Sequence, residues 1–366
     1  MTTSPTAPTL DRSTGTGAAE PLGQPELDPL IAPCLREAVA ALDGRAPILA
    51  AMVRYHLGEA DADGAAVAAG GVDRGKRVRP AVALLCCAAA GGRVETAAPL
   101  AAALELLHNF TLIHDDIQDE SPTRRHRPTV WRLWGVGQAI NAGDALFAAA
   151  HLPLHRLRRE GVDADLVLRL LETFERTTIA IVEGQALDLG FEGRADVTPD
   201  AYLAMIAGKT AAIVRYAAWA GALLGGADEA TAERFGAFGL ALGLGFQVRD
   251  DALGIWGASA TTGKAVADDV RRRKQSLPIL LLREGADAAT RAELADIYAA
   301  PEIATPGVDR VLALLAAAGV RAEIESRVVG FHDEARTALL AAARPGPNAA
   351  RDRLLALVAG LAGRDG

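Results

Sequence analysis

Long apolar stretches with charges at helical spacing dominate this chain from about residue 27 onward. Alanine, leucine and valine prevail in them, and they cover residues 31–57, 79–90, 97–117, 141–159, 166–189, 199–224 and 231–255. Apolar residues that recur every three to four positions predict α-helices, whereas the strict alternation typical of strands is scarce. Segments rich in Gly, Pro and Asp separate the stretches, at residues 58–75, 190–199, 257–263 and 300–307. The sequence therefore predicts an all-α fold, a single-domain helical bundle.

The first 25 residues have a different composition, rich in Thr, Pro, Gly and Ser. Such a segment has too few large apolar side chains to form a core, so we expect a disordered tail at residues 1–25. The helical domain is expected at residues 26–366. Two interpretations of the tail stay open: a solvated extension, or a docking peptide for a partner or compartment shell, carried by short motifs such as residues 9–12 (Thr-Leu-Asp-Arg).

Bulk properties exclude several classes of protein. A chain of 366 residues, 50% of them hydrophobic, can bury a large core, and its formal charge of −8 argues against nucleic-acid binding. Three cysteines without a CxxC pair favour a reducing cytoplasm. Apolar runs such as Ala81–Ala90 are shorter than the ~18 residues of a membrane span, and the N-terminus lacks an export signal pattern.

An acidic cluster lies at the end of one apolar stretch, at Asp115, Asp116 and Asp119. Asp115 and Asp119 are four residues apart, so on a helix their carboxylates lie on one face and can share a cation. Carboxylates in apolar sequence need a compensating charge. Mg²⁺ prefers oxygen ligands and typically takes one or two carboxylates plus substrate phosphates. The cluster therefore predicts a magnesium site.

Basic residues accompany this cluster. Arg124 and Arg125 follow it and offer planar guanidinium groups for phosphate oxygens, while His108 precedes Asp115 by two helical turns and can face the same cavity. Farther upstream, residues 75–80 read GKRVRP and open an apolar helix. Cations at the electropositive start of a helix form an anion seat.

A second acidic cluster begins at Asp250 and Asp251, within the sequence FQVRDDALG. Lys264, the Asp268–Asp269 pair and Lys274 follow it, and Lys209 with Thr210 lies upstream on helix-like sequence. Together these residues supply further carboxylates for a metal and cations for anionic oxygens. A site that combines carboxylates for a metal ion with cations for anionic oxygens is suited to binding a diphosphate.

The motifs GKRVRP, LIHDDIQDESPTRR, GKT, FQVRDDALG and TGK, in this order and at these separations, resemble those of trans-isoprenyl diphosphate synthases. The resemblance runs from about residue 30 to the C-terminus. It implies an all-α fold with a central cavity and a homodimer. It also implies Mg²⁺-dependent condensation of isopentenyl diphosphate with an allylic diphosphate.

The resemblance also assigns roles to residues. The metal would be bound by Asp115, Asp116, Asp119, Asp250 and Asp251, with Asp269 as a further carboxylate. Isopentenyl diphosphate would be seated by Lys76, Arg79, His108 and Arg125. The allylic diphosphate would contact Arg124, Lys209 and Lys264, with Lys274 nearby, while Thr210 and Gln247 would line the reacting end.

Two positions depart from the family pattern. Gly254 stands where the second motif usually has its last Asp, so one carboxylate is lost, although Asp268 or Asp269 remains available. The family has a later aspartate at this point. One member of the pair matches it when positions are counted from Lys264, and the other when they are counted from Lys274, so the choice between them stays open. After the double Arg, His126 and Arg127 replace a usual Gly and are expected to add positive charge at the mouth of the site.

Product length depends on bulk one turn before the first cluster, because the growing tail runs down the bundle from the metal. Phe110 lies five residues before Asp115, and Thr111 is small. In the family an aromatic residue there suggests a product of fifteen or twenty carbons, and we favour twenty. Two alternatives stay open: a class I terpene cyclase, and a non-catalytic subunit of a heteromeric synthase.

Overall fold

The computed structural model describes residues 20–68, 71–73, 75–257 and 267–363. The chain is 75% helical with almost no strand and forms a single domain, which confirms the predicted all-α class. Residues 9–12 of the tail and Lys264 lie outside the described residues. The described chain begins at Glu20, and its first helix begins at Gln24.

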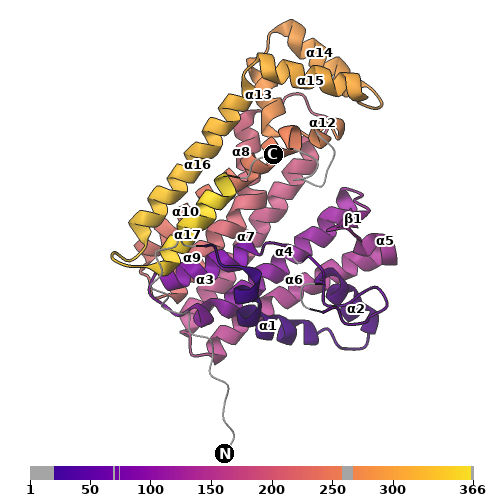
Figure 1. Cartoon of the computed structure of the whole chain (residues 1–366). Helices are drawn as coiled ribbons and strands as arrows, with labels where there is room; N and C mark the ends of the chain where they lie inside the picture. The colour runs from indigo at the N-terminus through magenta and orange to yellow at the C-terminus, as the bar shows by residue number, and fades with distance from the viewer. Residues whose placement is uncertain (1–19, 69–70, 74, 258–266, 364–366) are drawn as a thin grey trace, which may run out of the picture.

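The N-terminal part of the chain forms the lower half of the molecule in Figure 1. Its elements are α1 (Gln24–Ala40), α2 (Pro47–His56), α3 (Val78–Ala89), the 3₁₀ turn η1 (Val94–Ala97), α4 (Ala98–Gln118), the hairpin strands β1 (Thr123–Arg124) and β2 (Arg127–Pro128), α5 (Val130–Trp134), α6 (Val136–Arg159) and α7 (Ala164–Phe191).

The prediction of one continuous helical stretch over residues 31–57 is wrong. The chain leaves the helix after Ala40 and begins α2 at Pro47. Gly44 favours a turn between them, and proline is well suited to the first position of a new helix because that position needs no backbone N–H donor.

The C-terminal part begins with α8 (Pro199–Ile206), the π-helical turn η2 (Ala207–Ala211), α9 (Ala212–Leu224) and α10 (Glu229–Trp256). It continues with α12 (Asp268–Arg271), α13 (Leu277–Gly285), α14 (Ala288–Ala299), α15 (Thr305–Ala317), α16 (Val320–Ala342) and α17 (Ala349–Ala362). Several helices start where a side-chain oxygen accepts a hydrogen bond from a first-turn N–H, which is the usual N-cap. These capping residues are Asp163, Thr198, Asp228, Asp287 and Asn348.

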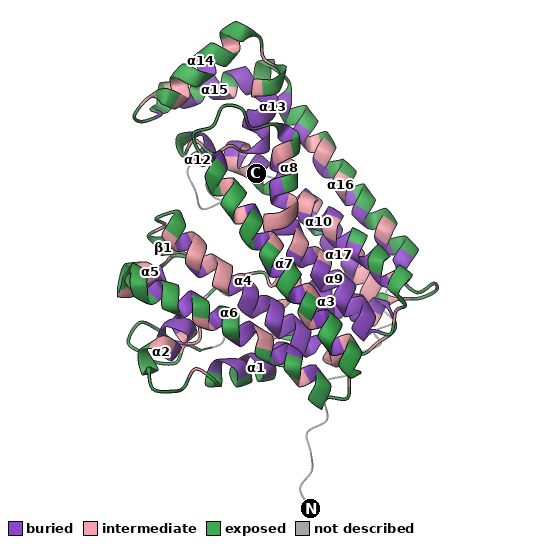
Figure 2. Cartoon of the chain, turned by 180° about the vertical axis from the view of Figure 1, so that it is seen from behind, coloured by how far each residue is buried: buried purple, intermediate pink, exposed green. Residues whose placement is uncertain are grey.

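The larger core surrounds α3, which contacts α4, α9 and α17. Figure 2 shows buried residues concentrated along α3, α4 and α9. Most of α3 is buried, as expected of a helix that is apolar all round. Small residues let the backbones approach: a Cβ on Gly221 of α9 would lie only 3.1 Å from the Cα of Ala83.

A smaller core joins α8 to α12–α16 in the upper part of Figure 1. Helix α10 belongs to both cores, because Phe235 and Phe238 near its start pack in the larger one and Val248 and Ile255 near its end pack in the smaller. The second acidic cluster, on the last turns of α10, therefore lies in the part of the helix that packs in the smaller core.

Residues 94–118, which comprise η1 and α4, are long and apolar enough to cross a membrane by length and composition. The expectation that apolar runs fall short of that length therefore fails for this helix. Within its most apolar window, 72% of the residues are buried inside the fold. Burial of this kind is what a core helix of a soluble protein shows, so the apolar character of α4 is accounted for by packing.

Candidate active site

The first acidic cluster lies at the C-terminal end of α4. Asp115 lines a cavity of about 170 Å³, and Asp119 is the exposed residue that ends the helix. Burial raises the pKa of Asp115 to about 6, Lys209 and Arg124 lower it, and Asp119 and Asp116 raise it further. Burial is therefore the main reason that the pKa of Asp115 is raised, and the nearby cations offset it only in part.

Asp116 has a different environment from its neighbours. Its side chain is 2% exposed and accepts hydrogen bonds from Arg124 Nε at 2.8 Å to Oδ1 and 2.9 Å to Oδ2. The short hairpin β1–β2 places Arg124 there by pairing it with Arg127. In this arrangement Asp116 orients Arg124 toward the site, while Asp115 and Asp119 keep their oxygens available.

Arg127, which we expected at the mouth of the site, is bound to α2 and the loop that follows it. Its guanidinium donates to the carbonyls of Tyr55 at 3.0 Å and Ala60 at 2.9 Å, and it stacks on the Tyr55 ring at 3.9 Å. Arg127 thus ties the hairpin to α2, and the exposed His126 is the residue left at the surface.

A chain of hydrogen bonds organises the second acidic cluster. Asp251 is buried and accepts from Tyr202 Oη at 2.6 Å, from Gln247 Nε2 at 3.1 Å and from Leu277 N at 3.2 Å. Gln247 in turn accepts from Thr210 Oγ1 at 2.9 Å. Burial raises the pKa of Asp251 to about 7 although these donors lower it. Asp250, its neighbour, is exposed.

Lysines stand between the two acidic clusters. The π-helical turn η2 carries Lys209 and Thr210, and Lys209 forms an ion pair with Asp188 of α7. Desolvation lowers the pKa of Lys274, but four carboxylates outweigh it and raise that pKa above its usual value. They are Asp269, Asp119 of the first cluster, Asp188 of α7 and Asp251 of the second cluster. Lys274 therefore lies near carboxylates of both clusters, which are far apart in the sequence.

Gly254 makes room for the carboxylate of Asp269. A Cβ at position 254 would lie 2.6 Å from the Cγ of Asp269, and Asp269 is buried. Asp268 instead pairs with Arg272 at 3.2 Å. Of the two aspartates, Asp269 is thus the one whose carboxylate occupies the space left by the side chain that Gly254 lacks.

A second cavity, of similar volume, holds the predicted anion seat. Lys76, Arg79, His108 and Arg125 line it together with Arg77, Val78, Pro80, Glu105 and Phe246. Arg79 and His108 also line the first cavity, so the two cavities adjoin. Burial lowers the pKa of Arg79 to about 10 and that of His108 well below its usual value, which leaves the imidazole neutral.

Apolar side chains form part of the wall of the first cavity. Phe110, Ile181, Val182 and Ile213 line it, together with Thr111. Phe110 lies against the ring of His114 at a centroid distance of 4.9 Å and against that of Phe147 of α6 at 5.3 Å. Phe110 is therefore a bulky aromatic residue of the cavity wall, held by two neighbouring rings.

The donor set fits a hard divalent cation. Asp115, Asp119 and the exposed Asp250 offer carboxylate oxygens, the ligands that Mg²⁺ prefers, whereas both oxygens of Asp251 already accept hydrogen bonds. Within the part of the chain that the structure describes, no three acidic, His or Cys groups are gathered closely enough to hold a metal by themselves. Mg²⁺ bound there would complete its octahedral shell with waters and substrate phosphates.

Sequence reasoning missed several residues of this site. Tyr202, Phe147 and Glu105 carry no motif of their own, although Glu105 is a lone charge in the otherwise apolar start of α4. A charged residue in an otherwise apolar helix indicates that a partner of opposite charge is buried beside it. Tyr202 and Phe147 give no comparable signal, because their neighbours come from other helices.

The fold and the site define a class of protein: a helical bundle in which an acidic residue, a cationic seat and apolar side chains line two adjoining cavities, with a second acidic cluster nearby. This arrangement suits diphosphates with apolar tails. The family model described as polyprenyl synthetase matches residues 66–315.

Curated relatives agree with that match. A geranylgeranyl diphosphate synthase of Mycobacterium tuberculosis is 43% identical over 313 residues, which cover 85% of this chain and 87% of the relative. A (2E,6E)-farnesyl diphosphate synthase of the same species is also 43% identical, over 68% of this chain and 67% of the relative.

Solved structures show the same fold. The polyprenyl synthetase from Streptomyces coelicolor superimposes with a TM-score of 0.79 at 38% identity, covering 91% of this chain and 97% of that one. The geranylgeranyl pyrophosphate synthetase from Pyrococcus horikoshii gives a TM-score of 0.81 at 31% identity, covering 92% and 96%. The chain belongs to the polyprenyl synthetase family and is a transferase of the short-chain trans-prenyl diphosphate synthase type.

Proposed function

We propose that this protein condenses isopentenyl diphosphate head-to-tail with an allylic diphosphate, in a Mg²⁺-dependent reaction, and releases geranylgeranyl diphosphate. The observation that carries the proposal is the lining of the first cavity, where the carboxylate of Asp115 lies together with the cations of Arg79 and Lys209. One cavity thus combines a carboxylate for a metal with cations for phosphates. Asp119, Asp251 and Asp269 all raise the pKa of Lys274, so this lysine lies near both acidic clusters.

Different residues bind the two diphosphates and the metal. Lys76, Arg79 and Arg125 hold the diphosphate of isopentenyl diphosphate in the second cavity, and Arg124, Lys209 and Lys274 face the allylic diphosphate. Bound Mg²⁺ would supply charge neutralisation for the leaving diphosphate, held by Asp115, Asp119 and the second cluster. Fixed cations aimed at a developing negative charge are a major source of catalysis.

The apolar wall then protects the reacting carbon. When the allylic C–O bond breaks, the carbocation lies beside Ile181, Val182 and Ile213, which keep water away. The alkene of isopentenyl diphosphate attacks it and forms the new C–C bond. A proton leaves the adjacent carbon for the released diphosphate. Holding both substrates in register supplies much of the rate.

Phe110 supports a product of twenty carbons. It narrows the apolar cavity about one turn before Asp115, and the small Thr111 beside it leaves room that a second aromatic residue would remove. A fifteen-carbon product is the second candidate, since a farnesyl diphosphate synthase is as identical to this chain as a geranylgeranyl diphosphate synthase is.

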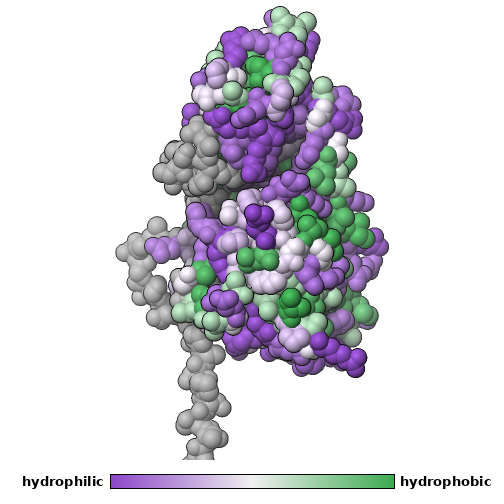
Figure 3. Space-filling model, turned by 90° about the vertical axis from the view of Figure 1, so that its right-hand side faces the viewer, coloured by the Kyte–Doolittle hydropathy of each residue, from purple (hydrophilic) through white to green (hydrophobic). Residues whose placement is uncertain are grey.

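We propose that the protein acts as a cytoplasmic homodimer through α6 and α7. Large apolar side chains on these two helices are exposed, among them Ile140 at 43%, Ile179 at 57% and Val182 at 52%. Val182 also lines the cavity, so a second copy over this face would help to exclude water. Figure 3 shows hydrophobic patches on one side of the larger, lower part of the molecule, and exposed patches of this kind mark association surfaces.

Product analysis tests the proposal directly. The purified chain is incubated with isopentenyl diphosphate and, in turn, the five-, ten- and fifteen-carbon allylic diphosphates, with Mg²⁺ or with a chelator. We expect the twenty-carbon diphosphate from each starter, and none with the chelator. The variant Asp115→Ala should lose turnover, whereas Asp309→Ala, at an exposed position of α15, should keep it. Full activity of Asp115→Ala at saturating Mg²⁺ would refute the metal assignment, and hydrocarbon released from geranylgeranyl diphosphate alone would indicate a cyclase.

A further inference from the structure

The loop that carries the anion seat has a costly backbone conformation. Gly75 has φ +77° and Arg77 has φ +46°, so both lie in the left-handed region. Glycine tolerates that region, whereas for arginine it costs about 1 kcal/mol or more. Arg77 is also the N-cap residue immediately before α3, between Lys76 and Arg79 in the sequence. The positions of both seat cations therefore depend on what holds Arg77 in place.

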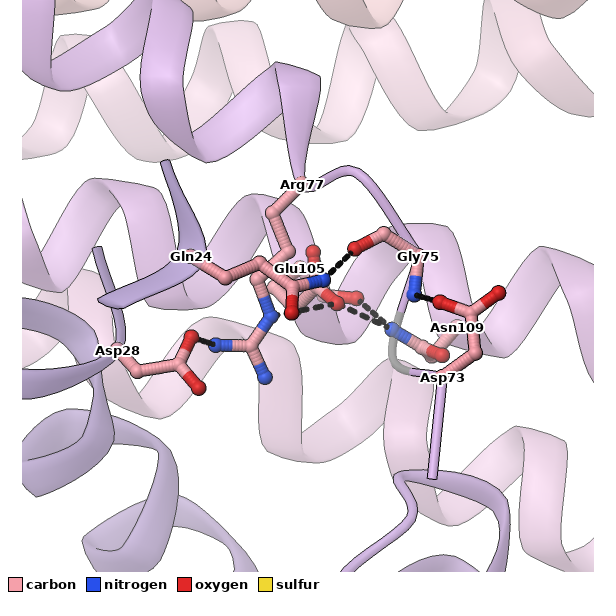
Figure 4. A network of polar contacts seen from close by, with 7 residues as sticks. All are labelled: Gln24, Asp28, Asp73, Gly75, Arg77, Glu105 and Asn109. Atoms are coloured by element: carbon pink, nitrogen blue, oxygen red, sulfur yellow. Dashed lines mark hydrogen bonds and ion pairs between the residues drawn. The ribbon is translucent and has the colours of Figure 1, made fainter. Parts of the chain in front are cut away.

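Figure 4 shows the polar contacts that hold this loop. Gly75 donates to Asp73 Oδ1 at 2.7 Å, and its carbonyl accepts from Gln24 of α1. The guanidinium of Arg77 is 7% exposed and forms an ion pair with Asp28 of α1. On its other side, Arg77 Nε lies 3.6 Å from Glu105 Oε1 of α4. Arg77 is thus held between two carboxylates from two different helices.

Glu105 is an unexpected residue for an anion seat. Among the described residues that line the second cavity it is the one carboxylate, and it is 4% exposed. A buried negative charge beside a diphosphate would oppose binding unless it serves another purpose. Its own position is fixed, because Oε1 accepts from Asn109 Nδ2 at 3.1 Å one turn along α4.

The charges around Glu105 agree with a structural purpose. Burial lowers the pKa of Arg79 and of Arg125, and in both cases the negative charge of Glu105 opposes that effect. Arg125 also packs against Gly75, where a Cβ would come within 3.0 Å of its Cζ. Glu105 therefore has its direct contact with the loop cation Arg77, and its charge reaches Arg79 and Arg125 of the seat only at longer range.

We propose that Glu105 is a positioning residue for isopentenyl diphosphate: together with Asp28 it clamps Arg77, which presets the loop so that Lys76 and Arg79 converge on the diphosphate. This inference rests on the proposed function, because it assumes that the second cavity binds that diphosphate. It assigns Glu105 no contact with the reacting atoms.

The variant Glu105→Gln tests the clamp, since it keeps the shape and the acceptor for Asn109 but removes the charge. We expect the KM for isopentenyl diphosphate to rise roughly tenfold, the size expected for loss of one buried charge-assisted contact. The kcat and the KM for the allylic diphosphate should change less than about twofold, because those substrates' contacts are untouched. Glu323→Gln, an exposed Glu→Gln change on α16 that also removes a salt bridge, is the matched control.

A double-mutant cycle with Arg77→Gly shows whether Glu105 acts through Arg77. Glycine adopts the left-handed conformation without a clamp and removes the cation. In that background Glu105→Gln should change the KM for isopentenyl diphosphate by less than about twofold. A tenfold rise that persists would overturn the proposal, because Glu105 would then act on the substrate or on other cations. So would an unchanged KM in the single variant.

Two further measurements keep the test decisive. If Glu105→Gln does not fold, Asp28→Asn loosens the same clamp at its half-buried end and should raise the same KM, by a smaller factor; an unchanged value would count against the clamp. Isothermal titration of the wild type with isopentenyl diphosphate distinguishes failure of the proposed function from failure of the role of Glu105. Wild type that neither binds nor turns over this substrate would refute the proposed function itself, whereas normal wild-type behaviour with an unaffected variant refutes only the role of Glu105.

Discussion

Replacing Gly254 by alanine tests the close approach of Asp269 to α10. Alanine favours a helix over glycine by about 1 kcal/mol, so an open helical glycine gains stability from this change. At position 254 the new Cβ would lie 2.6 Å from the Cγ of Asp269. Carbon atoms in contact normally lie about 3.5–4.0 Å apart, so the buried carboxylate must move by about 1 Å.

Overpacking of this kind typically costs about 1–3 kcal/mol. Combined with the gain in helix propensity, Gly254→Ala should leave the free energy of unfolding unchanged or lower it by up to about 2 kcal/mol. The matched control is Gly330→Ala, in the middle of α16, where a Cβ meets nothing within 4 Å. That control should gain about 1 kcal/mol.

Urea unfolding followed by circular dichroism gives both free energies. Asp269→Ala should remove the clash, so adding Gly254→Ala in that background should recover the gain seen at position 330, a non-additive result. Titration of each variant with Mg²⁺ and inorganic diphosphate should show weaker binding wherever Asp269 is displaced or absent. If Gly254→Ala stabilises the wild-type chain as much as Gly330→Ala does, the carboxylate of Asp269 does not lie against Gly254 and the reasoning is refuted.

The remaining predictions concern the cavity floor, a buried hydrogen bond and a histidine. Phe110→Ala should shift the product beyond twenty carbons and Phe147→Ala should do so less, as measured by mass spectrometry of the products; unchanged products would exclude Phe110 as the floor. Tyr202→Phe should lower the free energy of unfolding by about 1–3 kcal/mol, because buried Asp251 loses a donor; an unchanged urea midpoint would contradict this. Burial, helped by Arg124 and Arg125, lowers the pKa of His56 from 6.5 to about 3. The free energy of unfolding is therefore unaffected by His56 above the unfolded pKa of 6.5 and falls as the pH drops below it. The reason is that the unfolded chain then binds a proton that the folded chain does not. Between pH 7.5 and pH 5 wild type should therefore lose about 1–2 kcal/mol more than His56→Gln, and equal losses would show that His56 is accessible.

Much of the fold follows from local sequence. Helices α3, α4, α7 and α10 begin and end within a few residues of the predicted stretches, because apolar periodicity and capping residues act over one or two turns. Where the prediction failed, between α1 and α2, the turn signals at Gly44 and Pro47 were present in the sequence but were outweighed by the apolar residues on either side.

The sequence predicts those parts of the site in which charged residues lie in apolar sequence, because such residues need a partner of opposite charge. That argument predicts that Asp115, Asp251 and Arg124 belong to one site, whereas Lys209 is assigned only through the resemblance to the family. It could not say that Asp116 would bind Arg124 and that Asp115 would line the cavity, because neighbouring residues of one helix point in different directions and only the packing decides what each one meets.

By itself the sequence determined the helical class, the two acidic clusters and the cations that accompany them. Tertiary structure alone decided which residues complete the site. Asp269 fills the space beside Gly254, Glu105 and Asp28 hold Arg77, and Phe147 backs Phe110. Each of these contacts joins residues more than a dozen positions apart. Local periodicity carries no record of such contacts, because they depend on how whole helices pack.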